Sequence, residues 1–166
     1  MMIWVNIFAS LILFFSLIGG LKEGAVKQFF SLIALLIAIP LAGISYHLLA
    51  GLLSFIPGEN WENFIGFFIM LVVVSIILHF VFLLPRKFLQ KVWKQGLLFR
   101  LIGAAFNIFN ATIGMVVFAL VLGAYPIFDW LERAVTGSVI LNWLVSQLSF
   151  VQAVLPEVFR QAATMV

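Results

Sequence analysis

Few side chains in this sequence are suited to catalysis or metal binding. The chain has six Asp and Glu residues, two His and no Cys, which excludes disulfides, thiolate metal sites and cysteine nucleophiles. Asp129, the only Asp, follows the last long apolar run together with Glu132, so no carboxylate is expected deep in a membrane. We find no Gly-rich phosphate loop, no Gly-x-Ser-x-Gly turn and no His pair at metal-ligand spacing. The sequence therefore predicts a non-enzymatic protein with no catalytic residue, metal site or cofactor.

The two histidines are the residues that a haem shared between helices would need. His47 lies about 18 residues after the start of its apolar run, and His79 about 15 residues after the start of the next, antiparallel run. At about 1.5 Å per residue, their depths in a membrane differ by roughly 20 Å. Two axial ligands of one haem must nearly meet at the iron. We therefore expect no shared haem.

The most informative polar feature is one face of the apolar run 101–125. On a helix, the positions of Gly103, Asn107, Asn110 and Gly114 project to the same side. An amide without a partner is costly in hydrocarbon, so the two asparagines must face protein or water. This face is predicted to be a helix-packing or partner face.

Two interpretations of these amides remain open. In the first, they bond to a neighbouring helix, either the face of small residues on the second apolar run or Asn6 and Ser10 of the first run. In the second, they line a polar pathway for a solute or bind a partner protein. The first describes a packed bundle, and the second describes a transport or binding site.

The second apolar run carries a stripe of small residues on one face. Small residues let helices approach closely, because association in lipid depends on van der Waals contact. We expect this stripe to pack against another helix or a partner. Its members include Ser31, Ala34, Ala38 and Ala42.

Hydropathy supplies the elements that would position these residues. The chain is 65% hydrophobic and only 9% charged, too few charges to cover a water-soluble domain of 166 residues. Soluble enzymes, nucleic-acid binders and disordered chains are thereby excluded. Four apolar runs approach or exceed the ~20 residues that a transmembrane helix needs, and the sequence predicts an all-α integral membrane protein with about four transmembrane helices. These runs are residues 2–19, 29–55, 64–84 and 101–125.

The chain after the fourth run is expected to form a separate tail. We divide the sequence into a four-helix transmembrane domain, 1–125, and a C-terminal helical tail, 126–166. The uncharged stretch 139–155 carries a polar stripe and is at the short limit for crossing a bilayer. An amphipathic, interfacial or re-entrant helix is therefore favoured, with a fifth span as the alternative.

The distribution of basic residues indicates the orientation of the helices. Lys and Arg gather in the 22–28 turn and the 85–100 loop, whereas the charged residues of the 56–63 loop are all acidic. Since basic loops stay in the cytoplasm, the first two segments are predicted to be cytoplasmic. The net charge of +3 thus reflects topology and no nucleic-acid partner is expected.

The 85–100 loop has the pattern of a basic amphipathic helix on the inner leaflet. Its cations and amides occupy one side of a helical wheel, and Phe88, Leu89 and Trp93 the other. We expect contact with anionic lipids, with docking of a cytoplasmic partner as the alternative. The basic residues are Arg86, Lys87, Lys91, Lys94 and Arg100.

Two segments carry a family resemblance. The turn with Gly20, Gly24 and Lys27, running into Ser31, resembles the first turn of the CvpA, or colicin V production, family. The stretch 99–103, Phe-Arg-Leu-Ile-Gly, is similar to the turn before the family's last span, with Phe where the family has Asp. The resemblance implies a four-span, multi-pass protein of the bacterial cytoplasmic (inner) membrane. It also implies a link to toxin production or export and to envelope homeostasis, with no established chemistry.

These observations together predict an accessory or scaffold protein of the membrane. Its partners would be the lipid bilayer and either another protein or further copies of this chain. The alternative is a small transporter or channel component that uses the Asn107 and Asn110 face as a polar pathway.

Overall fold

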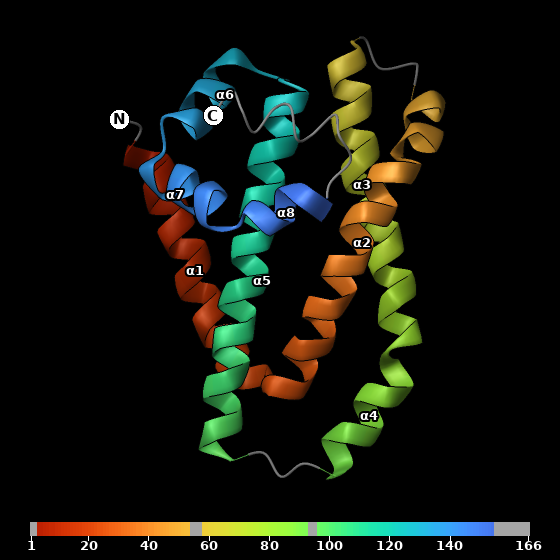
Figure 1. The fold of residues 1–166 in the computed structure, drawn as a ribbon, viewed down its shortest axis with the longest axis vertical. Coiled ribbons are helices and arrows are strands. Elements are labelled where there is room, and N and C mark those ends of the chain that lie inside the picture. The colour runs from red at the N-terminus through yellow and green to blue at the C-terminus, as the bar shows by residue number, and fades with distance from the viewer. Residues whose placement is uncertain (1–2, 54–57, 93–95, 155–166) are drawn as a thin grey trace.

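The protein is a bundle of helices joined by short connections (Figure 1). A computed structural model describes residues 3–53, 58–92 and 96–154, and these contain no β-strand. The long helices are α1 (Ile3–Glu23), α2 (Ala25–Leu52), α3 (Glu59–Val81) and α5 (Leu97–Ala124). The short helices are α4 (Leu83–Val92), α6 (Asp129–Thr136), α7 (Val139–Gln147) and α8 (Ser149–Val154).

The four long helices are the transmembrane helices that hydropathy predicts. The shortest span has 21 residues, and at 1.5 Å per residue it extends about 30 Å, the thickness of the hydrocarbon core. The structure therefore confirms an all-α membrane protein with four transmembrane helices. The spans are Ile3–Glu23, Ala25–Leu49, Asn60–Val81 and Leu97–Ala124.

The long helices form two pairs joined through α5. Helix α1 packs along α5, α2 packs along α3, and α5 also contacts α2 (Figure 1). Only Gly24 separates α1 from α2, and the two helices diverge from it like the arms of a V. Helix α5 is therefore the central helix: 56% of its most apolar 18-residue stretch is buried, against 11% for α3.

The two ends of the bundle differ in composition. The basic end comprises the α1–α2 turn, α4 and the start of α5, and it carries Lys22, Lys27, Arg86, Lys87, Lys91 and Arg100. The opposite end, called the aromatic end, comprises the starts of α1 and α3, the end of α5 and α6. There Trp4 lies 6.0 Å from Trp130 and Trp61 lies 5.1 Å from Phe128, between ring centroids. Tryptophan is typical of a membrane interface.

The apolar core lies toward the aromatic end. Helix α5 contributes Ile113, Val116 and Leu120, which are completely buried. Helix α2 adds Ile39, and α3 adds Phe67. The tail helices close this core with Leu141, Leu144, Val145, Leu148 and Val151.

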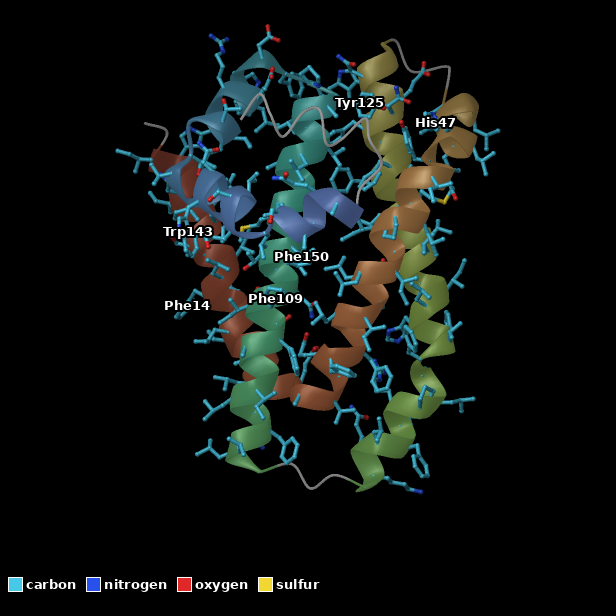
Figure 2. All side chains as sticks on the ribbon, viewed as in Figure 1. Phe14, His47, Phe109, Tyr125, Trp143 and Phe150 are labelled. Atoms are coloured by element: carbon cyan, nitrogen blue, oxygen red, sulfur yellow. The ribbon has the colours of Figure 1, made fainter. Side chains whose placement is uncertain are left out.

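The tail forms three short helices, whereas the sequence analysis expected one helix over 139–155. Leu148 ends α7 with a non-helical ψ of 44°, and α8 begins at the next residue. Among the described residues, neither helix is long enough to be a fifth span. Both pack across α5, and Phe150 of α8 stacks on Phe109 of α5 with centroids 6.0 Å apart (Figure 2). Residues 155–166 lie outside the described residues.

Candidate functional site

The turn between α1 and α2 is pressed against α5 by glycines. Gly24 has a φ of +79°, which a side chain rarely tolerates, and it reverses the chain in a single residue. A Cβ on Gly20 would lie 2.4 Å from the backbone oxygen of Gly103, and one on Gly103 would lie 2.6 Å from the backbone carbon of Gly24. Three of the glycines singled out from the sequence thus form one backbone-to-backbone contact.

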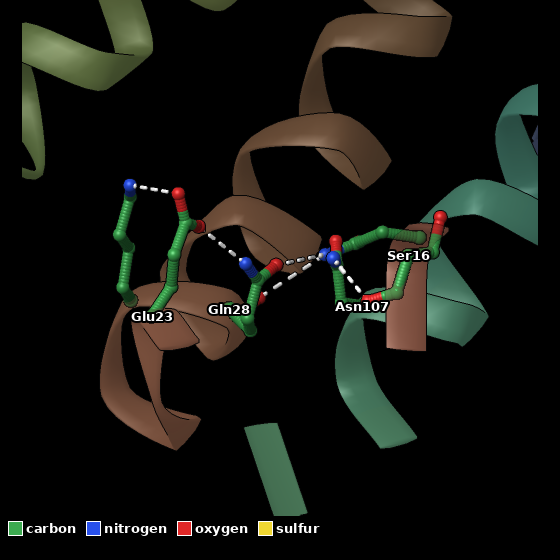
Figure 3. Close-up of polar contacts among 6 residues, drawn as sticks. Ser16, Glu23, Gln28 and Asn107 are labelled. Atoms are coloured by element: carbon green, nitrogen blue, oxygen red, sulfur yellow. Dashed lines mark hydrogen bonds and ion pairs between the residues drawn. The ribbon is translucent and has the colours of Figure 1, made fainter. Parts of the chain in front are cut away.

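A chain of polar side chains begins at this turn and ends on α5 (Figure 3). Lys27 forms an ion pair with Glu23 at 2.5 Å, and the other Glu23 oxygen accepts a hydrogen bond from Gln28 Nε2 at 2.6 Å. Asn110 Nδ2 lies 3.3 Å from both the side-chain and the backbone oxygen of Gln28. Asn110 of α5 therefore bonds to α2 through the buried Gln28.

Asn107, the other amide on this face of α5, bonds to α1. Asn107 Nδ2 donates to the backbone oxygen of Ser16 at 2.7 Å (Figure 3). That oxygen is already part of the α1 backbone, so the bond joins two helices without a second polar side chain. Gly19 leaves the room for it, since a Cβ there would lie 3.0 Å from the same Nδ2 atom.

The amides bond to the two helices considered in the sequence analysis, α2 and α1, but to other residues of those helices. Asn6 lies near the other end of α1, where its Oδ1 accepts hydrogen bonds from Ser138 Oγ at 2.7 Å and Ile140 N at 3.3 Å. Ser10 is exposed. Asn6 therefore holds the tail, and the amides of α5 bond to a backbone oxygen and to Gln28. These partners depend on which helices pair, and sequence periodicity gives no information about that pairing.

The small stripe of α2 divides into two parts. Ala38 and Ala42 are completely buried where helices approach closely. Ser31 is exposed and Ala34 half-buried, and both line a cavity near the basic end. The last residue of the α5 face, Gly114, is exposed and has open space beside it, so it makes no close packing contact within the described chain.

The basic helix α4 is amphipathic, as expected from the sequence, and it also packs against the bundle. It begins at Leu83, two residues before Pro85, and Arg86 and Leu89 turn toward the bundle, where they line cavities. Phe88 is 69% exposed beside the exposed Lys87. One side of α4 packs against α2 and α3, so Arg86 from its polar side and Leu89 from its apolar side both lie against protein. Lys91 and Arg100 are exposed, and Lys94 lies outside the described residues.

Two polar contacts were not anticipated from the sequence. Gln28 stands directly after Lys27 near the start of α2 and is only 3% exposed, and an amide next to an apolar run was its one sequence signal. The hydroxyls of Tyr46 and Tyr125 lie 2.6 Å apart, linking α2 to the end of α5. These are the two tyrosines of the chain, but nothing in their spacing predicts that they meet.

The histidines lie apart from each other. His47 is exposed near the aromatic end, with its ring 3.9 Å from that of Tyr46 (Figure 2). His79 lies in the last turn of α3, toward the basic end, and lines the same cavity as Ser31. Among residues 3–53, 58–92 and 96–154, no group of three His, Cys, Asp or Glu side chains is placed to hold a metal ion.

Comparison with known families shows which family this chain belongs to. The family model described as colicin V production protein matches residues 5–149. The chain belongs to this family. Searches of curated proteins and of solved structures found no match. The match covers all four transmembrane helices and reaches into the tail, as the resemblance in the turn and in the 99–103 stretch had suggested.

The structure brings the two segments that resemble the family into one contact. In this member of the colicin V production family, Gly20 and Gly24 of the first segment contact Gly103 of the second. Lys27 stabilises the turn through its ion pair with Glu23. The two segments are separated by more than seventy residues along the chain, yet they form the joint that fixes α1 and α2 on α5.

Proposed function

We propose that this protein is a non-enzymatic accessory or scaffold protein of the bacterial cytoplasmic membrane, linked to toxin production or export or to envelope homeostasis. One observation carries the proposal: both amides of α5 donate their hydrogen bonds inside the bundle. They serve to hold helices together and leave an outer surface that is largely apolar. A surface of this kind suits contact with lipid and with other transmembrane helices.

The arrangement of the remaining polar groups favours a scaffold over a conduit. The carboxylates of the described chain lie at the ends of helices or in the tail, and none lies midway along a span. Coupled transporters place an ionisable group there. The half of the bundle toward the aromatic end is filled by apolar side chains. This apolar packing supports a scaffold more than a water-filled route from the amides to that end.

Gly114 is the position that we assign to a partner helix. It is exposed on α5, and a Cβ there would meet open space. Small residues on a lipid-facing surface let a second helix approach closely. Substitution Gly114→Leu is expected to preserve the folded monomer and to remove a protein, or a second copy of the chain, that copurifies in mild detergent. Gly51→Leu, another exposed glycine with open space, serves as the control.

The second candidate function is a small transporter or channel component. Asn110 Oδ1 is buried and has no hydrogen-bond partner among the described residues, as expected of an atom that meets water or a solute. In proteoliposomes, the scaffold proposal predicts that small polar solutes leak no faster than from empty vesicles. Leakage that Asn107→Leu with Asn110→Leu abolishes, in a protein that still assembles, would favour the transporter.

The orientation in the membrane follows from the charges. We place the basic end in the cytoplasm, because Lys and Arg are retained on that side. Lys91 and Asp129 are exposed at opposite ends of the bundle. In a chain without native Cys, Asp129→Cys should react with an impermeant maleimide on intact spheroplasts, and Lys91→Cys only after lysis. The reverse pattern would contradict the orientation.

The outer side of α4 is the surface that we assign to anionic lipid. Exposed Leu84 and Phe88 stand beside exposed Lys87 and Lys91. Apolar side chains enter the acyl boundary of a bilayer while lysines remain with the headgroups. Contact of this kind anchors the basic end to the inner leaflet and requires no defined binding site.

A further inference from the structure

Two cavities meet at Phe30 near the basic end. The first has a volume of about 250 Å³ and lies between the α1–α2 turn, α2, α3 and α4. Its polar lining consists of Glu23, Lys27, Ser31, Ser75, His79 and Arg86. The second has a volume of about 340 Å³ and an entirely apolar lining that includes Phe29, Leu89, Phe99, Ile102 and Phe106. Phe30 lines both, so a polar and an apolar space adjoin.

The polar cavity contains one positive charge without a counter-charge. Arg86 Nε is buried and has no hydrogen-bond partner among the described residues. Glu23, the carboxylate of this cavity, already binds Lys27 with one oxygen and Gln28 with the other. A guanidinium remains ionised in proteins, and a buried charge without a partner is costly. The Nε–H group is therefore free to donate to an anionic ligand in this cavity.

The groups around Arg86 suit a phosphate. A guanidinium binds two phosphate oxygens at once through parallel N–H groups. Ser31 and Ser75 carry hydroxyls that donate to further oxygens, and His79 carries a ring N–H. Lys27 adds a second cation at the rim. Basic pockets between transmembrane helices on the cytoplasmic side are suited to lipid headgroups.

The apolar cavity indicates where the phosphate would come from. It is lined mainly by aromatic and branched side chains of α2, α4 and α5, and Phe29 and Phe106 meet there with ring centroids 5.7 Å apart. Helix α4 contributes Arg86 to one cavity and Leu89, three residues later, to the other. A free phosphate has no apolar group to fill this space, whereas a phospholipid has an acyl chain next to its phosphate.

We propose that the two cavities together bind one anionic phospholipid, with its phosphate at Arg86 and the start of an acyl chain beside Leu89. This site is distinct from the outer side of α4, which contacts lipid without selecting it. It does not depend on the scaffold function. The bound lipid would join α2, α3 and α4 and supply a negative counter-charge to Arg86.

The test compares two neighbouring cations on α4. Arg86 points into the polar cavity, while Lys87 is exposed, so Arg86→Gln and Lys87→Gln remove the same charge from the same helix. Binding of phosphatidylglycerol to the delipidated protein in detergent would be measured by native mass spectrometry. We expect Arg86→Gln to weaken binding at least tenfold and Lys87→Gln to change it less than twofold. Equal effects of the two substitutions would overturn the proposal.

Further variants separate the site from folding and the lipid from free phosphate. Arg86→Lys keeps the charge without the paired N–H groups, and we expect partial binding by a protein with an unchanged helical circular dichroism spectrum. Leu89→Trp fills the apolar cavity and should weaken binding of long-chain phosphatidylglycerol more than binding of its dihexanoyl analogue. The proposal would be wrong if inorganic phosphate at equal concentration stabilised the protein as much as phosphatidylglycerol, or if Leu89→Trp affected both chain lengths alike.

Discussion

The basic end and the aromatic end of this bundle are held together by different means. At the basic end, backbones touch through Gly20 and Gly103, and buried amides bond between helices. At the aromatic end, large apolar side chains such as Leu120 and Phe67 fill the interior, and short tail helices cover it. The basic end also contains the two cavities that meet at Phe30.

The difference shows how one small membrane protein combines a rigid joint with a binding space. Lipid tails are as apolar as leucine, so burying leucine gains little in a bilayer, and close contact and hydrogen bonds must supply the stability. Glycines and amides do this at the α1–α2 turn. A cavity lies beside this joint, between α2, α4 and α5. Substitutions at the two ends should therefore destabilise the protein for different reasons.

The largest effect is expected at the glycine contact. In Gly103→Ala, the new Cβ would lie within 3 Å of backbone atoms of Gly20, Gly24 and Ala25. Backbone atoms cannot rotate away, so we expect a loss of about 3 kcal/mol or more, at the upper end of the costs of overpacking. Gly114→Ala on the same helix is the control, since nothing lies near its Cβ. Unfolding in mixed micelles measures both, and equal stabilities would contradict the contact.

The next effect belongs to the apolar core. Leu120 is completely buried, and Leu120→Ala leaves a cavity that we expect to cost about 2–3 kcal/mol. Leu101, on the same helix, is 53% exposed, so Leu101→Ala should cost far less. The same unfolding assay applies. A large loss in Leu101→Ala would mean that this surface is covered by protein.

A smaller effect is expected when one amide is removed. Asn107→Leu deletes the hydrogen bond to the Ser16 carbonyl, and single interhelical hydrogen bonds in membranes contribute about 0.6–2 kcal/mol. Ser10→Ala removes an exposed hydroxyl elsewhere on α1 and should be neutral. If Asn107→Leu stabilised the protein, the amide would be facing a water-filled or partner-binding space instead.

The smallest effect is expected at the ion pair. Lys27 and Glu23 are 37% and 40% exposed, so solvent screens their attraction and Lys27→Gln should cost only about 0.5 kcal/mol. Lys22→Gln, at an exposed lysine of the same turn, controls for the change in net charge. The difference between the two variants should shrink as salt is raised from 50 to roughly 500 mM. A salt-independent loss would point to disruption of the turn.

The spans could be predicted from the sequence because hydropathy alone carries that information. Runs of about twenty apolar residues leave few alternatives to a transmembrane helix. Gly24 could also be assigned to a turn, since it stands between two such runs, whereas Lys27 lies on α2, which begins at Ala25. The tail was less predictable: the break at Leu148 has no Gly or Pro to mark it and arises where α7 and α8 pack across α5.

The candidate site was only partly predictable, because its contacts depend on which helices pair. Periodicity put Asn107, Asn110 and Gly114 on one face of α5, yet the two amides are half-buried and Gly114 is exposed. The amides bond to Gln28 and to a backbone oxygen, and neither partner has a distinctive pattern. The inward position of Arg86 likewise follows from the packing of α4 on α2.

The most direct test of the joint at the basic end is a double-mutant cycle between Gln28 and Asn110. The two side chains lie within 3.3 Å, so Gln28→Leu and Asn110→Leu should be coupled by about 0.5–1.5 kcal/mol in the free energy of unfolding. A parallel cycle between Asn6 and Asn110 should be additive, since Asn6 bonds to Ser138 in the tail. Coupling in the first cycle alone is the predicted result. Additivity in both cycles would show that the amides of α5 do not hold the helices together.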